Sequence, residues 1–588
     1  MIQISRARRR PPYMSRMDMP VPISGSTDAA APLDNLVHAA EGRLTHGLSS
    51  TALGLAWQDW ATHLANSPFR RLALARDALQ QARRFAEVAL TGTRAIAAPP
   101  GDHRFAAPGW DHPPFLLAEQ AFLLAQQWWE QAAAGAEGTA RANARIVGFM
   151  ARQWLDLLSP SNLPWLNPEV IAATVESGGR NLLAGSANAL HDLHRLLSGR
   201  PDGAAFRVGR DIAATPGKVV LRNRLIELIQ YSPATATVRP EPVLIVPAWI
   251  MKYYILDLSA QDSLIRWLVA QGYTVFAISW HNPTEADRDL SLEDYRERGV
   301  MAAIAAALAI TGAPRLHATG YCLGGTLLAI AAAAMGRVGD DRLASVTLFA
   351  AQTDFTEAGE LQLFITEDQL DFLDDLMAAQ GYLDSRQMAG AFQMLRANDL
   401  IWSRAVRAYL LGEAEHPSDL MAWNEDGTRM PARMHSEYLH RLFLDNDLAE
   451  ARFPAGGAPV SLADIRAPFF VVGTETDHIA PWRSVYKLHL LNEGDLTFVL
   501  TAGGHNAGVV SEPGHPHRHY RILRRAPGDR YRDPEAWMAA AAMHDGSWWP
   551  EWVRFLDRAS GPPGPPPPLG NAAFPAAEAA PGRYVHER

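Results

Sequence analysis

One stretch decides the fold: Arg315-Leu316-His317-Ala318-Thr319-Gly320-Tyr321-Cys322-Leu323-Gly324-Gly325. It predicts a short strand, a glycine-rich turn and a helix, with the only cysteine of the chain at the turn. This is the pattern of a nucleophile elbow, in which a reactive side chain lies on a strained corner between small residues. Gly320 and Gly324 are those small residues, two positions before and two after the cysteine.

A cysteine at this corner suits acyl transfer. A thiolate is a strong nucleophile that exchanges acyl groups with a thioester at little cost in free energy. The same corner directs the backbone N–H of Leu323 toward the nucleophile, where it can stabilise an oxyanion. The alternative is that Cys322 is a small buried hydrophobic residue, as most free cysteines are. A catalytic cysteine requires that an acid and a histidine follow it in the right order, whereas a buried structural cysteine does not.

The composition excludes several classes of protein. The chain has 588 residues, one cysteine and a net charge of −9. This length exceeds one compact core, so we expect two domains. One cysteine excludes an internal disulfide and is typical of a reducing compartment, so we expect a cytoplasmic protein. The chain is acidic and has no basic stripe, which argues against nucleic acid as a partner. No apolar run reaches the roughly 18 residues of an integral membrane segment.

Composition and the spacing of apolar residues divide the sequence into four parts. Residues 1–31, with four arginines among the first ten, are expected to be a disordered basic leader. Residues 32–205 carry apolar positions at helical spacing without a strand pattern, which predicts a helical N-terminal domain for oligomerisation or surface attachment. Residues 206–560 are expected to form the catalytic domain, and residues 561–588 a proline-rich linker and tail.

Within residues 206–560, short β-rich runs alternate with helical runs, which is typical of a parallel sheet. A mostly helical segment at about 352–454 interrupts the alternation, as a cap over an active site does. The expected fold class is therefore α/β: an α/β-hydrolase fold with an inserted helical cap, preceded by an all-helical N-terminal domain. The expected strands are 219–221, 227–231, 243–246, 274–279, the strand before Cys322, 345–350, 469–473 and, as the last of the sheet, 496–501.

An acid and a histidine do follow the elbow in the right order. Asp477 comes shortly after the strand 469–473, and His505 comes shortly after the strand 496–501. Because parallel strands end at the same edge of a sheet, we expect Cys322, Asp477 and His505 to form a catalytic triad there. In it His505 takes the proton of Cys322, and Asp477 orients the imidazole.

The second oxyanion donor is expected in the loop that follows the strand 243–246. An α/β-hydrolase usually supplies a backbone N–H from this loop. The candidates are the N–H groups of Trp249 and Ile250, acting together with that of Leu323.

Other residues near the expected acid compete for the roles. His478 is a rival base, but it is adjacent to Asp477 in sequence, and adjacent loop residues rarely face each other, so we expect it to support the site. Glu475 is a rival acid, less favoured because Asp477 leads into a turn before the next helix. Further along, a cluster has histidine alternating with proline and arginine, and a solvated loop is favoured over a metal site because only one carboxylate is near. This cluster is His515, Pro516, His517, Arg518 and His519, with Glu512 as the carboxylate.

Longer motifs around these residues resemble the polyhydroxyalkanoate synthases, of the class I type that makes poly-3-hydroxybutyrate. The resemblance spans most of the chain, and the block 247–258 is its most specific piece. The other matching stretches are 320–325, 477–482, 504–505, Phe105 with Trp110, Pro114 and Phe115, 159–162, and 581–585.

The resemblance implies an enzyme that polymerises (R)-3-hydroxyacyl-CoA and releases CoA, with Cys322, Asp477 and His505 as its triad and an acyl-cysteine intermediate. Tyr321 and Leu323 resemble the short-monomer members, so 3-hydroxybutyryl-CoA is the expected substrate. No cofactor and no metal are expected. The implied partners are the growing polyester chain, the granule surface and a second copy in a homodimer. With one cysteine per chain, elongation uses either a noncovalent intermediate or Cys322 of a second subunit.

Three departures from the family pattern bear on monomer preference and polymer contacts. His281 stands where arginine is usual, Ser403 where asparagine is usual, and Asn506 where an aliphatic residue is common. Two other functions stay open. One is a thioesterase or polyester depolymerase that uses the same triad with water as the acceptor, and the other is a catalytically silent protein of the granule surface.

Overall fold

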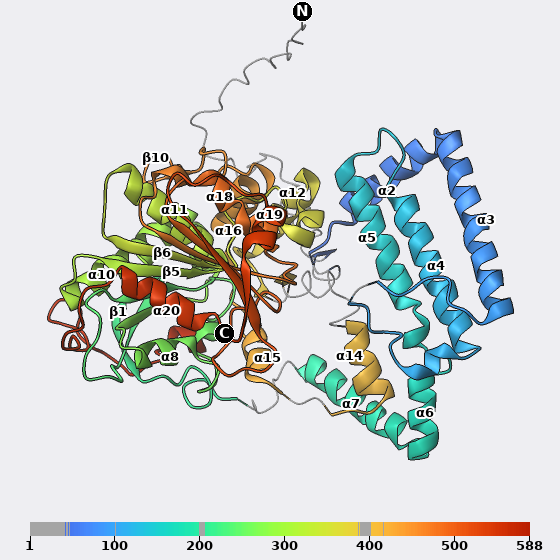
Figure 1. The fold of residues 1–588 in the computed structure, drawn as a ribbon, viewed down its shortest axis with the longest axis horizontal. Helices are drawn as coiled ribbons and strands as arrows, with labels where there is room; N and C mark the ends of the chain where they lie inside the picture. The colour runs from blue at the N-terminus through green and yellow to red at the C-terminus, as the bar shows by residue number, and fades with distance from the viewer. Residues whose placement is uncertain are drawn as a thin grey trace, which may run out of the picture.

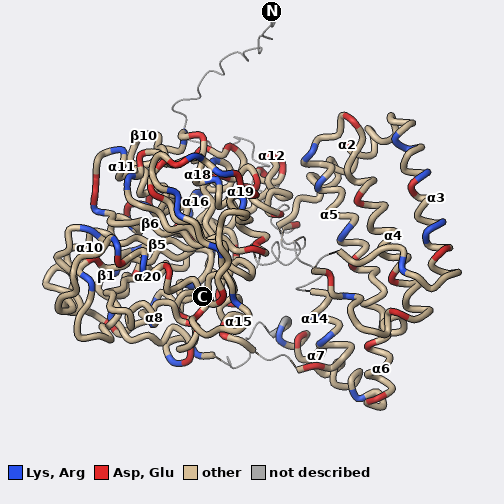
Figure 2. The backbone as a smooth tube through the Cα atoms, viewed as in Figure 1, with Lys and Arg blue, Asp and Glu red and all other residues tan. Residues whose placement is uncertain are grey.

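The computed structural model describes residues 41–588, except 43–44, 46, 100, 199–205, 386, 389–400 and 415–416. The expected leader at 1–31 lies outside the described residues. Figure 1 shows a group of helices from the N-terminal third of the chain beside a larger part built on one sheet. Lys and Arg alternate with Asp and Glu over both parts in the view of Figure 2.

The regular elements that the structure describes in residues 41–198 are all helices. Trp60 and Trp110 are buried among these helices, and the Trp60 indole N–H donates to the Ala132 carbonyl over 3.0 Å. Buried Arg104 bridges Asp102 and Asp156, each over 2.7 Å. The elements are α2 (Ser50–Ala65), α3 (Pro68–Thr91), η1 (Pro108–Asp111), α4 (Phe115–Ala133), α5 (Arg141–Leu157), η2 (Pro160–Asn162), α6 (Pro168–Ser177) and α7 (Arg180–Ser198). None of the described helices of the chain is long and apolar enough to cross a membrane.

The larger part is organised around a ten-stranded sheet with the order β1-β2-β4-β3-β5-β6-β11-β12-β13-β14. The six strands from β4 to β12 run parallel, and the two strands at each edge run antiparallel to their neighbours. The strands are β1 (Gly217–Arg222), β2 (Ile226–Tyr231), β3 (Val243–Val246), β4 (Val275–Trp280), β5 (Leu316–Tyr321), β6 (Leu343–Phe349), β11 (Phe469–Thr474), β12 (Leu496–Thr501), β13 (His519–Arg525) and β14 (Ala542–Asp545).

The expectation that β12 is the last strand is wrong, because β13 and β14 continue the sheet. Both strands lack the apolar signature of the inner ones. β13 carries Arg521, Arg524 and Arg525, and every residue of the edge strand β14 is exposed. An edge strand with one solvated face needs few apolar residues, so neither strand stands out in the sequence.

Helices cover both faces of the sheet, which is why its inner strands are buried at nearly every position. In β3, Val243 and Ile245 face the core with α8 and α20, whereas Leu244 and Val246 face the core with α10 and α11. Alternate residues of a strand point to opposite faces, so both sets are buried. The helices are α8 (Leu264–Ala270), α9 (Leu292–Asp294), η5 (Tyr295–Met301), α10 (Ala302–Thr311), α11 (Leu323–Arg337), α17 (Trp482–Tyr486), α18 (Leu488–Leu491), α19 (Pro534–Ala540) and α20 (Trp549–Arg558).

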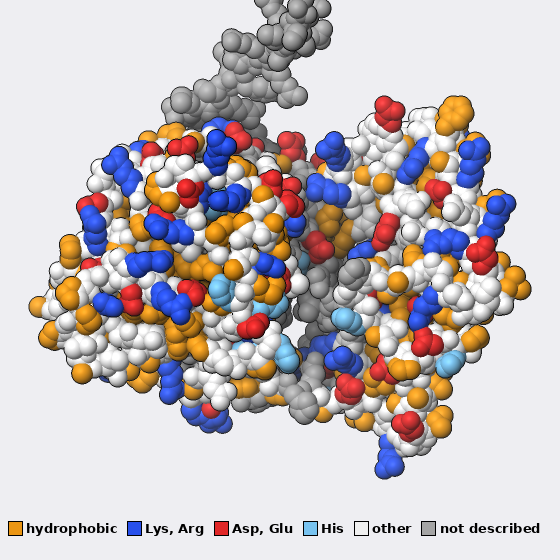
Figure 3. Space-filling model, viewed as in Figure 1, with side chains coloured by type: hydrophobic (Ala, Val, Ile, Leu, Met, Phe, Trp, Pro, Cys, Tyr) orange, Lys and Arg blue, Asp and Glu red, His pale blue; other side chains and the backbone are white. Residues whose placement is uncertain are grey.

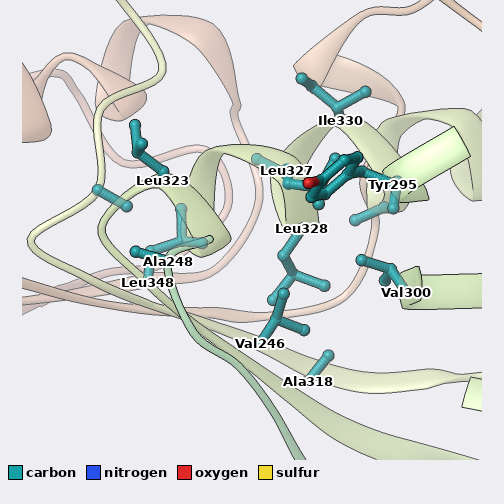
Figure 4. Packing of buried hydrophobic residues seen from close by; sticks show 14 of the residues in the cluster. Val246, Ala248, Tyr295, Val300, Ala318, Leu323, Leu327, Leu328, Ile330 and Leu348 are labelled. Atoms are coloured by element: carbon teal, nitrogen blue, oxygen red, sulfur yellow. The ribbon is translucent and has the colours of Figure 1, made fainter. Parts of the chain in front are cut away.

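The helix α11 is the closest-packed element on this sheet. Its leucines meet apolar residues of β3, β5 and β6, and Figure 4 shows Leu327 and Leu328 above Val246 and Ala318. Full burial of each leucine contributes roughly 2 kcal/mol. The alanines of α11 bring its backbone close to the strands, and the start of the helix is thereby fixed above the end of β5.

A long insertion between β6 and β11 forms the cap. It is mostly helical, with two pairs of short strands, β7 with β8 and β9 with β10 (Ala458–Pro459), and it contacts the N-terminal part through α7. Asn181 and Asn188 of α7 donate side-chain N–H groups to the carbonyls of Leu410 and Ala408, over 2.8 and 2.9 Å. The elements are η6 (Gly359–Phe364), α12 (Glu367–Gln380), β7 (Tyr382–Leu383), α14 (Ser403–Ala405), η8 (Val406–Leu410), α15 (Asp419–Asn424), β8 (Met430–Pro431), α16 (Ala432–Tyr438), η9 (Leu439–Leu444) and β9 (Pro454–Ala455).

The proline-rich segment 561–588 lies along the outer strands of the sheet. The Val219 N–H donates to the Glu578 carbonyl over 3.0 Å, and the Ala577 N–H donates back to the Val219 carbonyl over 2.8 Å. Further along, the Lys252 ammonium donates to the Tyr584 carbonyl over 2.8 Å. These bonds hold the tail against the loop that follows β3.

Candidate active site

Cys322 lies at the corner between β5 and α11. Its backbone adopts φ 51° and ψ −125°, a conformation that L-residues other than glycine rarely take. Its N–H donates to the Phe349 carbonyl of β6 over 2.9 Å, which ties the corner to the neighbouring strand. Such strain costs roughly 1–3 kcal/mol, and the surrounding contacts maintain it.

Three glycines make the corner possible. A Cβ at Gly320 would lie 2.3 Å from the Cα of Gly325, and a Cβ at Gly324 would lie 2.2 Å from the Val246 carbonyl oxygen. A Cβ at Gly325 would lie 2.4 Å from the Cβ of Ala351. The sequence pattern identifies the first two glycines, and the structure adds Gly325 to them.

Asp477 and His505 meet at the same edge of the sheet, after β11 and β12. The Nδ1 atom of His505 lies 2.8 Å from Oδ2 of Asp477, and both side chains are buried. The other carboxylate oxygen accepts the N–H groups of Ile479 and Ala480, each over 2.8 Å, and Thr474 donates its hydroxyl to Oδ2 over 3.0 Å. With every lone pair directed, the carboxylate holds one orientation toward the imidazole.

Burial and nearby charges shift the pKa values of Asp477 and His505 in opposite directions. Burial acts to raise the pKa of Asp477, but His505 and the two backbone N–H groups bring it below the usual value. Burial acts to lower the pKa of His505, but the charges of Asp477 and Cys322 and hydrogen bonds with both raise it well above the usual value. His505 therefore contacts the carboxylate on one side and the thiol on the other, and the site favours an imidazolium.

The rival residues are engaged elsewhere. Glu475 pairs with Nε2 of His519 over 3.1 Å, so its carboxylate is directed away from His505. His515 lies beside Arg518, with 3.5 Å between Nε2 of the imidazole and Nη2 of the guanidinium. The positive charge of Arg518 disfavours a metal cation at this position. The hydrogen bond of Asp477 is made with His505, while the carbonyl oxygen of His478 lies against Gly359.

Of the three departures from the family pattern, one lies at the site. Tyr321 donates its hydroxyl to Oδ1 of Asn506, and its ring lies 5.5 Å from that of His505, centroid to centroid. His281 lies at the tail, with Nδ1 2.7 Å from Oε2 of Glu587. Ser403 begins α14 in the cap.

Two of the three residues predicted to supply oxyanion N–H groups, Leu323 and Ile250, border the cavity of Cys322. The Leu323 N–H is the first of α11 and has no acceptor within the helix. Ile250 borders the same cavity as Cys322. Thr428 of the cap holds this loop, because it donates its N–H to the Ile250 carbonyl over 2.9 Å and its hydroxyl to the Trp249 carbonyl. Trp249 is buried and does not line the cavity, whereas Ile250 does.

Cys322 opens into a cavity of about 100 Å³ under the cap, lined almost entirely by apolar side chains. Gln369 of α12 closes one side. Its Oε1 accepts the Ser49 N–H over 2.9 Å, and its Nε2 donates to the Gly47 carbonyl over 2.6 Å. The lining residues are Gly47, Leu48, Ile250, Cys322, Leu323, Leu361, Phe364, Ile365, Gln369, Leu373, Leu383, Gln387, Met388, His435, Tyr438, Leu439, Phe443 and Ile479.

Sequence reasoning did not identify the residues that the cap adds to this cavity. Tyr438 is buried near the thiol, and burial, followed by the charge of Cys322, raises its pKa well above the usual value. His435 lies one helical turn before it on α16. No motif marks these residues, because the cap packs on the elbow through contacts far apart in sequence.

Comparisons with known proteins agree with this architecture. Residues 101–268 match the family described as Poly-beta-hydroxybutyrate polymerase (PhaC) N-terminus, residues 28–70 match Poly-beta-hydroxybutyrate polymerase N terminal, and residues 241–511 match the alpha/beta hydrolase fold. The poly(3-hydroxyalkanoate) polymerase of Methylorubrum extorquens is 43% identical over 496 residues, which cover 83% of this chain and 81% of that protein. The poly(3-hydroxyalkanoate) polymerase subunit PhaC of Cupriavidus necator is 37% identical over 502 residues, 84% of each chain.

The single thiol gives a direct test of the Asp477–His505 pair. Because the Asp477 charge raises the pKa of His505, Asp477→Asn lowers it, and less imidazolium is present at pH 7 to stabilise a thiolate. We expect alkylation of Cys322 by iodoacetamide at pH 7 to slow about tenfold. Glu475→Gln is the matched control and leaves the rate unchanged. An Asp477→Asn variant that reacts as fast as the wild type would show that the pair does not act on the thiol.

Proposed function

Since the chain belongs to the poly(3-hydroxyalkanoate) polymerase family and is an acyltransferase that forms polyhydroxyalkanoate, we propose that it polymerises (R)-3-hydroxyacyl-CoA through Cys322. The proposed monomer is 3-hydroxybutyryl-CoA, and CoA is released. One observation carries the proposal: the only thiol of the chain lies on a strained corner, beside a buried Asp477–His505 pair, and opens into a capped apolar cavity.

In the first step, the Cys322 thiol attacks the carbonyl carbon of the CoA thioester. His505 holds the thiol proton on the nitrogen opposite Asp477, so the sulfur attacks as a thiolate paired with the imidazolium that this carboxylate stabilises. The N–H groups of Leu323 and Ile250 stabilise the tetrahedral oxyanion. The bond to the CoA sulfur then breaks, CoA leaves with the proton from His505, and an acyl thioester remains on Cys322. One thioester replaces another, so little free energy is lost.

In the second step, the 3-hydroxyl of another hydroxyacyl group attacks the acyl thioester. His505 removes the hydroxyl proton, the oxygen bonds to the carbonyl carbon, and the bond to Sγ of Cys322 breaks. The Cys322 sulfur recovers a proton from His505, and the new ester extends the chain by one unit. Elongation uses either a noncovalent intermediate in the same cavity or Cys322 of a second subunit in a homodimer.

The apolar cavity supports transfer to a hydroxyl in preference to transfer to water. Leucine, isoleucine and phenylalanine side chains from the cap and elbow surround the thiol. Such a lining gives water few hydrogen-bond partners, and a closed cap excludes it from the acyl intermediate. The same lining solvates the short alkyl group of a hydroxybutyryl unit.

The surface of α7 supports attachment to a polyester granule in the cytoplasm. Leu183, Leu190, Leu193 and Leu197 are between 50% and 78% exposed, while the polar Asn181 and Asn188 face the cap. The usual burial pattern of an amphipathic helix is thus reversed. Figure 3 shows that apolar side chains recur among the charged ones over the surface of the N-terminal part. We propose that the α7 leucines contact the apolar polymer surface.

The product distinguishes a synthase from a hydrolase. With (R)-3-hydroxybutyryl-CoA, we expect CoA release together with an insoluble polyester, and CoA release with only soluble free acid would contradict the proposal. Cys322→Ala should lower CoA release by at least about a thousandfold, as loss of a nucleophile does. A granule protein without catalytic function would show no such loss.

The same assay separates the two histidines. His505→Gln should abolish CoA release, because no other group then takes the Cys322 proton, whereas His478→Gln should only weaken it. Equal losses would show that the base is misassigned.

The granule contact is tested by a triple variant, Leu183→Ser, Leu190→Ser and Leu197→Ser. We expect the fraction of enzyme that sediments with isolated granules to fall severalfold, while the initial rate of CoA release in solution stays unchanged. Leu79→Ser, an exposed leucine of α3, is the control. Undiminished sedimentation of the triple variant would exclude α7 as the contact.

A further inference from the structure

His435 is a buried polar residue inside an apolar cavity. Its side chain comes from α16 in the cap, borders the same cavity as Cys322 and is 1% exposed. Its Nδ1 atom is buried and has no hydrogen-bond partner in the part of the chain that the structure describes. Buried polar atoms of native proteins are almost always paired, so an unpaired atom beside a substrate cavity indicates a ligand.

The other polar side chains of the cavity are already occupied or lie closer to the thiol. Gln369 uses both ends of its amide on the backbone of Gly47 and Ser49. Gln387 accepts the Asp384 N–H over 3.1 Å through its Oε1. Tyr438 is near enough to Cys322 for the thiol charge to act on its hydroxyl. The imidazole of His435 therefore remains as a hydrogen-bonding group of the cavity, beside the ring of Tyr438.

His435 lies next to Tyr438, whose hydroxyl is near the thiol. His435 and Tyr438 are three residues apart on one face of α16, and their ring centroids are 6.0 Å apart. Burial lowers the pKa of His435 to about 4, so the ring is neutral at pH 7, with one nitrogen that donates and one that accepts. A neutral ring can bind an uncharged hydroxyl without burying a charge.

The 3-hydroxyl is the group of the acyl chain that needs such a partner. In the proposed mechanism the N–H groups of Leu323 and Ile250 bind the thioester carbonyl, and apolar side chains such as Leu383 and Leu439 line the rest of the cavity. A hydroxyl group in that lining would otherwise lose its hydrogen bonds to water. We propose that His435 is a specificity residue that hydrogen-bonds the 3-hydroxyl of the acyl group on Cys322, an inference that rests on the proposed function.

The test compares two thioesters on the full-length chain. (R)-3-hydroxybutyryl-CoA carries the hydroxyl and butyryl-CoA lacks it, and the first CoA released per Cys322 is timed for each. We expect the wild type to favour the hydroxylated thioester about tenfold, the typical effect of one hydrogen bond. We expect His435→Leu to bring the ratio close to one by slowing only the hydroxylated thioester, and His435→Gln, which keeps a hydrogen-bonding group, to restore part of it.

His489→Leu is the matched control. His489 is also buried, has an unpaired Nε2 and has a pKa lowered by burial to about 3, but it lies outside the cavity, beside Tyr486. Its removal should leave the ratio unchanged. If the circular dichroism spectrum of His435→Leu differs from that of the wild type, the comparison is made with His435→Phe, whose ring is closer in shape to imidazole. The same criteria then apply to that variant.

Three outcomes overturn the inference: a ratio that persists without His435, equal slowing of both thioesters, or equal rates of the two thioesters in the wild type. The second outcome would mean that His435 only supports the fold or binds a water. Failure of the proposed function looks different, because the wild type would then either release CoA from neither thioester or release it from (R)-3-hydroxybutyryl-CoA with only soluble free acid and no polyester.

Discussion

The positive φ of Cys322 is maintained by contacts that leave no room for a side chain around it. Gly320 packs on Gly325, and Gly324 packs on the carbonyl of Val246, so the end of β5, the start of α11 and the end of β3 are held within van der Waals distance. The thiol is thereby raised above the edge of the sheet where parallel strands end. The long buried α11 supplies the packing energy that maintains this strain.

The electrostatics of the site depend on Asp477 and His505, which lie beyond the carboxyl ends of the parallel strands. Asp477 and His505 are both buried, and burial alone would neutralise them. Their mutual hydrogen bond and the N–H groups of Ile479 and Ala480 reverse this effect, so an ion pair persists next to the thiol. Apolar side chains of the cap border the cavity of Cys322, and a low local dielectric strengthens such interactions.

The sequence predicted the inner sheet and the site edge well, because buried parallel strands are continuous apolar runs and the reactive residues follow them directly. The fold class is confirmed, and Asp477 and His505 are in hydrogen-bond contact beyond the ends of β11 and β12, while their role as a triad with Cys322 stays a prediction. The arginine-rich β13 was missed, since an outer strand does not need an apolar pattern. The cavity was missed as well, because His435 and Gln369 reach it through tertiary packing of the cap, for which no local pattern exists.

The central claim is that Cys322 carries the acyl group. Butyryl-CoA lacks the 3-hydroxyl and stops the reaction after the first step, so mass spectrometry of the peptide that contains Cys322 tests the claim directly. The account predicts one butyryl group on Cys322 in the wild type and none in His505→Gln. CoA release with an unmodified Cys322, or a butyryl group on another residue, would contradict it.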